Sequence, residues 1–133
     1  MKEIYELKEP IGRIKDPKDI FKRINSFKID YKQENFIVIF LNTQNKVLGV
    51  ECLFKGGLSE CTIDPKVIFR RALIKNSSKI IISHNHPSNS LIPSYEDKDI
   101  FKRLKNIGNE LNLNVLDSII FNKNEYYSLL DKE

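Results

Sequence analysis

The segment that organises this chain reads Ile80-Ile81-Ile82-Ser83-His84-Asn85-His86-Pro87. Its apolar run is typical of a buried strand, and it ends in the only two histidines of the sequence, which are one residue apart. Residues i and i+2 of an extended segment project to the same face. The two imidazoles are therefore expected to point together from the end of a buried strand, where they can share one ion.

A second segment, Ser94-Tyr95-Glu96-Asp97, follows the histidines closely. Serine with an acidic residue three positions later is a common helix start, so Asp97 is expected in the first turn of a helix. Two histidines and a carboxylate suit a catalytic Zn²⁺ with an open fourth position. We interpret His84, His86 and Asp97 as its ligands. The alternative is a strand end followed by a capping box, which leaves unexplained why both histidines share one face beside a proline-bounded loop.

The composition is that of an ordinary globular protein. The 133 residues suffice for one domain with its own core, and 41% are hydrophobic and 30% charged. No apolar run approaches the roughly 20 residues of a membrane span, and the N-terminus lacks the apolar region of a signal peptide. We therefore expect a cytoplasmic protein without membrane contact. Cys52 and Cys61 fit no zinc-knuckle or redox spacing, and the net charge of +4 permits nucleic-acid contact without favouring it.

The periodicity and turn residues predict alternating strands and helices. The expected strands are 36–41, 47–54, a short one at 58–63, 79–83, 115–121 and 125–130, and the expected helices are 17–27, 65–76 and one that begins at Ser94. Residues 1–15 are expected to form an edge strand or an arm. We infer a single domain over 1–133, with a core of about 28–131 preceded by an N-terminal arm and helix (1–27). The order indicates an α/β sandwich, in which a mixed β-sheet is flanked by helices.

The two segments together match the pattern H-x-H-P-x6-S-x-x-D. In this the chain resembles the JAMM superfamily (MPN+, Mov34/PAD-1-like, JAB domain) of zinc metallopeptidases. His-Asn-His-Pro-Ser and the later Val115-Leu116-Asp117 resemble its RadC branch more closely than its deubiquitinating branch. The likeness runs from about Glu34 to Tyr127. It implies a cytidine-deaminase-like/JAMM sandwich and a zinc-dependent hydrolase that cleaves a peptide or isopeptide bond with metal-activated water.

The resemblance also implies roles that the residues alone do not indicate. Glu34 falls at the position of the family's general base, although by itself a glutamate before a strand is most simply a solvated strand end. Glu60 is the alternative base. The family pattern makes Ser94 a hydrogen-bond donor toward the oxyanion as well as a helix cap. Asp117 matches a recurrent family acid and is expected to contact a ligating histidine from outside the metal site, the alternative being a buried polar anchor.

At three positions the chain departs from the usual RadC sequence, none of them a metal ligand in the pattern. Asp64, Asn89 and Ser118 stand where RadC proteins usually carry His, Gly and His, which bears on substrate choice rather than on metal binding.

The expected partner is a peptide or protein substrate, including an isopeptide-linked conjugate. Two other classes compete with the hydrolase: a nucleic-acid-associated accessory protein of DNA repair, and a non-catalytic MPN scaffold. RadC proteins usually carry an N-terminal helix-hairpin-helix region, for which this sequence is expected to have no counterpart, so we expect weak or no nucleic-acid binding. An idle scaffold is disfavoured because every ligand of the motif is present.

Overall fold

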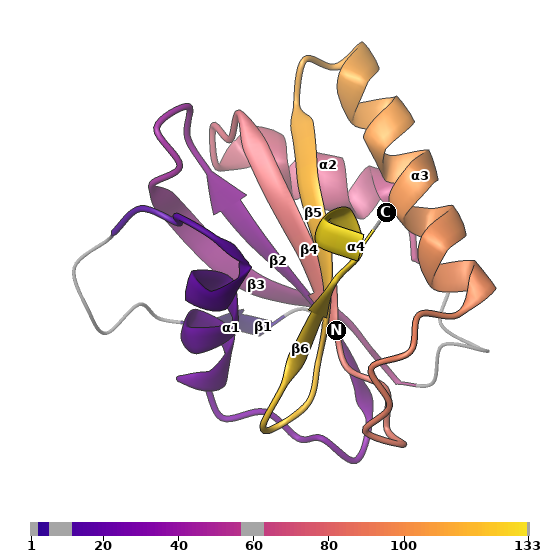
Figure 1. Ribbon diagram of the computed structural model, residues 1–133. Helices are drawn as coiled ribbons and strands as arrows, with labels where there is room; N and C mark the ends of the chain where they lie inside the picture. The colour runs from indigo at the N-terminus through magenta and orange to yellow at the C-terminus, as the bar shows by residue number, and fades with distance from the viewer. Residues whose placement is uncertain (1–2, 6–11, 57–62, 133) are drawn as a thin grey trace.

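A computed structural model describes residues 3–5, 12–56 and 63–132, and its centre is a mixed β-sheet (Figure 1). Within these residues the strand order is β1-β3-β2-β4-β5-β6. β4 and β5 are parallel, and every other neighbouring pair is antiparallel. The strands are β1 (Glu3–Tyr5), β2 (Glu34–Leu41), β3 (Val47–Gly56), β4 (Lys79–His84), β5 (Asn114–Phe121) and β6 (Tyr126–Ser128).

Helices cover both faces of this sheet, with α1 on one face and α2 and α3 on the other (Figure 1). The helices are α1 (Pro17–Asn25), α2 (Pro65–Ile74), α3 (Tyr95–Glu110) and the short α4 (Leu129–Lys132). Both α1 and α2 begin with an Asp-Pro pair, in which the aspartate side chain accepts a backbone N–H of the first turn and proline occupies the first helical position. Among the described residues, no helix is both long enough and apolar enough to span a membrane.

The apolar run of β2 is continuous because this strand is buried on both faces. Phe36, Val38 and Phe40 belong to the core beneath α2 and α3. The residues between them face the other way, into the core beneath α1. β4 follows the same alternation, since Ile80 and Ile82 pack toward α2 and α3 and Ile81 toward α1. The expected α/β sandwich with a mixed sheet and flanking helices is confirmed.

The structure differs from the sequence-based expectation mainly at the C-terminal end. The predicted strand 125–130 is shorter, because β6 ends at Ser128 and the chain turns into α4. A buried carboxylate causes the turn: Asp117 accepts hydrogen bonds from Ser128 Oγ and from the backbone N–H of Leu130. β1 pairs with β3 at the edge of the sheet, as the edge-strand alternative predicts. The expected strand 58–63 falls almost entirely outside the described residues.

Candidate metal centre

The two histidines lie at the end of β4. His84 is the last residue of the strand, is 2% exposed, and continues the alternation that carries Ile80 and Ile82 toward α2 and α3. Its ring stacks on that of its cross-strand partner Phe36, with 6.4 Å between centroids and 11° between planes. The centroid of His86 lies 5.0 Å from that of His84, so the imidazoles lie together as their spacing predicts.

Asp97 reaches both imidazoles from the N-terminus of α3. Ser94 caps the helix by accepting the N–H of Asp97 (3.1 Å), and the N–H of Ser94 donates to Asp97 Oδ2 (2.8 Å). This capping box holds the carboxylate toward β4. Oδ1 lies 3.0 Å from Nε2 of His84, and Oδ2 lies 3.0 Å from Nε2 of His86. The structure therefore brings the three predicted ligands together, with His84 and Asp97 buried and His86 partly buried.

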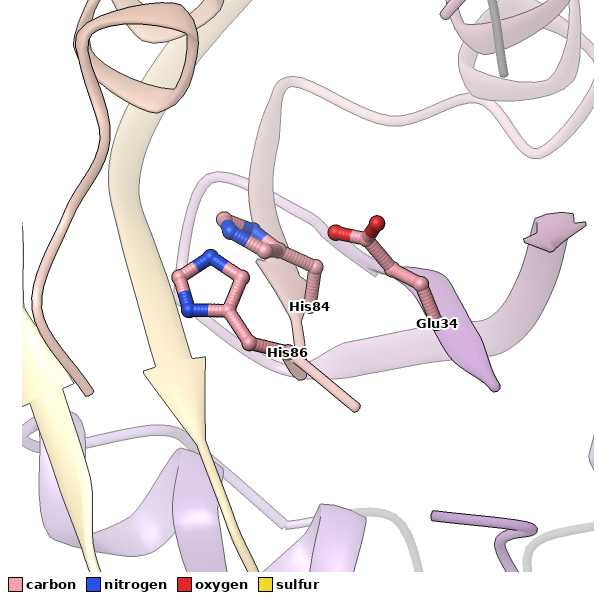
Figure 2. A group of neighbouring side chains, drawn as sticks. All are labelled: Glu34, His84 and His86. Atoms are coloured by element: carbon pink, nitrogen blue, oxygen red, sulfur yellow. The ribbon is translucent and has the colours of Figure 1, made fainter. Parts of the chain in front are cut away.

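Glu34 joins this group from the first position of β2. Phe36 pairs with His84, so two further residues along each antiparallel strand bring Glu34 toward His86. One ligand atom from each of Glu34, His84 and His86 lies within 4.8 Å of the other two, and the Glu34 side chain projects to the same side as both rings (Figure 2). Glu34 is only 4% exposed, which excludes the solvated strand end that its residue type alone indicates.

Hydrogen bonding fixes the tautomer of His86. Its Nδ1 lies 2.9 Å from the carbonyl oxygen of Ser90, and because a carbonyl only accepts, Nδ1 carries a hydrogen. Nε2 then faces the Asp97 carboxylate at 3.0 Å, an arrangement that requires either a second proton on the ring or a cation between the two groups. Metal-ligating histidines usually donate their other ring N–H in this way.

The pKa values of this pair move apart. The hydrogen bond with Asp97 raises the pKa of His86 and outweighs the opposing effect of burial. Burial acts to raise the pKa of Asp97, but the contacts with His84 and His86 outweigh it and hold that pKa well below its usual range. Asp97 is therefore ionised at neutral pH, which is the form that binds metals.

The residues present fit Zn²⁺. The Nε2 atom of His84 is out of hydrogen-bonding alignment with Asp97, and both ring nitrogens of His84 are buried without a hydrogen-bond partner in the described part of the chain. Buried polar atoms normally have a hydrogen-bond partner, so a ring nitrogen of His84 without one is expected if that nitrogen binds a metal ion. Nε2 of each histidine lies 3.0 Å from an oxygen of the Asp97 carboxylate, and two imidazole nitrogens with a carboxylate oxygen are a ligand set that suits zinc.

Asp117 lies apart from the two histidines. The hydrogen bonds that Asp117 accepts from Ser128 and Leu130 tie down the C-terminal segment. In the β4–β5 register Asp117 is level with Ile81, three residues before His84, or about 10 Å back along the strand. These contacts favour the alternative role of a buried anchor over the predicted contact with the histidines. Glu60, the alternative base, lies outside the described residues.

The three positions that depart from the usual RadC sequence have structural explanations in part. Asp64 caps α2 through the N–H of Lys66. Asn89 has a φ of 64°, a left-handed conformation that glycine adopts readily and asparagine tolerates, so it can replace the usual glycine. Ser118 is fully buried in β5, level with Ile82, and nothing in the structure explains its replacement of histidine.

Sequence reasoning missed the residues that support the site. Ser90 orients His86 through its carbonyl, a backbone role that no side-chain pattern reveals. Asn85 stands between the two histidines, and the alternation of side chains along an extended segment directs it away from them. It is fully buried and bonds to the start of β2. The one sign in the sequence that Asn85 supports the site was its position between the two histidines of the motif.

Comparison with known proteins agrees with this geometry. A model of the RadC-like JAB domain family matches residues 14–133. A UPF0758 protein of Clostridium botulinum (strain Eklund 17B / Type B) is 45% identical over 120 residues, covering 90% of this chain and 52% of the relative. A UPF0758 protein of Listeria innocua is 41% identical over 129 residues, covering 97% of this chain and 57% of the relative. The chain therefore spans about half the length of the curated relatives it matches.

Proposed function

Since this chain belongs to the RadC-like JAB domain family, we propose that it is a zinc-dependent metallohydrolase that cleaves a peptide or isopeptide bond. The observation that carries the proposal is the convergence of two imidazoles and the Asp97 carboxylate, with Glu34 beside them. In this proposal the ligands are Nε2 of His84, Nε2 of His86 and the carboxylate of Asp97. When bound, Zn²⁺ supplies a Lewis acid and lowers the pKa of a water at its open position to about 7.

Glu34 is the proton acceptor in this scheme. A general base must lie within hydrogen-bond reach of the proton that it removes, directly or through one water. One carboxylate oxygen of Glu34 lies within 4.8 Å of one ring nitrogen of each histidine, close enough for such a contact through one water. Its burial excludes bulk water and strengthens its electrostatic interactions in the site. The same carboxylate, now protonated, then donates this proton to the amine that leaves when the bond is cleaved.

Ser94 is the proposed donor to the developing oxyanion. Its Oγ accepts the N–H of Asp97, which leaves the hydroxyl hydrogen for donation. The positive end of the α3 dipole adds to the same effect, because Ser94 is the N-cap of that helix. The substrate class that this chemistry serves is a peptide or a protein, including a conjugate joined through a lysine side chain.

The test replaces Glu34 with glutamine and measures turnover on a panel of peptides and lysine-linked isopeptides. Glu34→Gln keeps the size of the side chain but removes the proton acceptor, so kcat should fall about 10²–10⁴-fold while one zinc per chain is retained. Glu96→Gln is the matched control, because Glu96 is an exposed acid in the first turn of α3. Full turnover by Glu34→Gln would assign the base to another acid such as Glu60, whereas no turnover by the unaltered protein on the whole panel would contradict the enzymatic function.

A further inference from the structure

We infer that Asn85, the residue between the two histidines, is a positioning residue that fixes Glu34 opposite the metal ligands. The inference rests on the proposed function, because it assigns to Asn85 the placement of the proposed base. It starts from the hydrogen bonds at the place where β2 and β4 stop pairing through their backbones.

The backbone ladder between β2 and β4 ends at the pair of Phe36 and His84. Beyond that pair, the side chain of Asn85 takes the place of a backbone rung. Its Oδ1 accepts the backbone N–H of Asn35 at 2.8 Å, and its Nδ2 donates to the backbone carbonyl of Gln33 at 3.0 Å. These two peptide groups flank Glu34, so one side chain holds the backbone on both sides of the proposed base.

The two bonds reproduce those between paired residues of parallel strands. In such a pair, the backbone of one residue accepts the N–H of the residue after its partner j, which is j+1, and donates to the C=O of the residue before it, which is j−1. Here residue j is Glu34, and the amide of Asn85 replaces the peptide group. Because Asn85 is covalently joined to His84 and His86, the clamp ties the position of Glu34 directly to that of the two imidazoles. Side-chain alternation keeps the amide itself off the side of the sheet where the imidazoles lie.

Asparagine is the residue that this position requires. The side chain is fully buried, and it needs a donor and an acceptor on one short planar group. Aspartate lacks the donor, and glutamine is one methylene longer. The neighbouring Asn35 strengthens the clamp, since its Nδ2 donates to Asn85 Oδ1 at 3.1 Å and to the Asp30 carbonyl at 2.9 Å.

The experiment is a double-mutant cycle on the affinity of the whole chain for Co²⁺, which substitutes for Zn²⁺ and reports its environment by visible absorption. Replacing a group that supports metal ligands from outside typically costs 10–100-fold in metal affinity. Asn85→Ala and Glu34→Gln should each weaken Co²⁺ binding about tenfold. If Asn85 acts through Glu34, the double variant should bind no more than about twofold more weakly than Glu34→Gln alone, because coupled residues are not additive. The change that Asn85→Ala makes in the cobalt bands should likewise disappear in the Glu34→Gln background.

Ser83→Ala is the matched control. It removes another buried side-chain bond from β4 to the backbone of β2, that of Ser83 Oγ to the Ile37 carbonyl at 2.9 Å, but keeps both bonds that flank Glu34, so its Co²⁺ affinity should stay within about twofold of the unaltered protein. Loss of affinity in Ser83→Ala equal to that in Asn85→Ala would reduce the role of Asn85 to stability. If Asn85→Ala does not fold, Asn85→Ser is used, since its hydroxyl is too short to span both peptide groups.

Two results overturn the inference in different ways. A double variant weaker by the product of the two single effects, about a hundredfold, would show that Asn85 acts on the histidines independently of Glu34 and would leave the proposed function intact. Failure of the unaltered protein to bind Co²⁺ would overturn the metal centre itself, and the positioning role with it.

Discussion

Glu51 and Asp97 are two buried carboxylates whose partners differ: the partner of Glu51 is always charged, and those of Asp97 are charged only when protonated. Glu51, in β3, is fully buried and receives two hydrogen bonds of 2.8 Å from the guanidinium of Arg71 in α2. That contact raises the pKa of Arg71, so the cation is permanent. Asp97 is 2% exposed, but its partners besides the cap of its own helix are two imidazoles that carry charge only when protonated.

The difference separates a structural ion pair from a site that takes up a cation. The Glu51–Arg71 pair is neutral overall and complete within the chain. The Asp97 cluster reaches the same balance only with a proton or a metal ion from solution. Both acids are buried, Glu51 against α2 and Asp97 in the first turn of α3, so burial alone does not distinguish them. The chemistry of their partners does.

The largest effect expected from this difference is stabilisation by zinc. A ligand that binds only the folded chain stabilises it by about 4 kcal/mol when its free concentration is a thousand times Kd. Urea unfolding with buffered Zn²⁺ and with a chelator measures this. His86→Ala should abolish the effect, whereas Arg71→Ala should leave it unchanged. Equal stabilisation of His86→Ala by zinc would place the metal elsewhere.

Arg71→Ala should have the next largest effect, about 3 kcal/mol of lost unfolding free energy, because it removes the guanidinium from a buried carboxylate. Lys75→Ala is the matched control. Lys75 lies 3.7 Å from Glu51 and is partly exposed, so its loss should cost less than about 1 kcal/mol. Urea titrations without metal compare the two variants. Equal losses would contradict the view that the bidentate contact dominates.

Ser94→Ala should cost about 1 kcal/mol of stability, as the loss of a helix cap does. Zinc content should be retained, because the hydroxyl is not among the ligands. If Ser94 also steadies the oxyanion, kcat should fall by roughly 10²–10³. A melting curve paired with kcat separates the two roles, and a lowered melting temperature with unchanged kcat would reduce Ser94 to a cap.

The smallest effect is the pH dependence of the metal-free protein. Because the pKa of His86 is raised, its contact with Asp97 stabilises the folded chain fully when the pH is below 6.5, the ordinary pKa of histidine. This stabilisation is lost as pH rises through the pKa of His86 in the folded chain. The lowered pKa of Asp97 means that its contribution is present above 3.8 and is lost only as pH falls through its folded value. Stability with a chelator should therefore decline as pH rises from about 6.5 through the raised pKa of His86, and level off above it. With Zn²⁺ it should increase over the same range, because zinc displaces protons. His86→Gln should remove both trends.

The parts of the fold that local chemistry specifies were predictable from the sequence. The Asp-Pro pairs mark the starts of α1 and α2, and the apolar run of β2 indicates a strand buried on both faces. The place of Glu34 was not predictable from its own residue type, because it depends on the register between two strands about 50 residues apart in the chain. The sequence left the role of Asp117 open between a contact with the histidines and a buried anchor, because its contacts depend on where β6 ends and α4 begins.

The central claim is that His84, His86 and Asp97 hold one metal ion, and anomalous X-ray scattering at the zinc edge tests it most directly. Crystals grown with Zn²⁺ should show one anomalous peak about 2.0–2.1 Å from the Nε2 atoms of both histidines and beside the Asp97 carboxylate. Crystals of His86→Ala should lack this peak. No peak among these three side chains in the unaltered protein, or a peak held by other residues, would contradict the account.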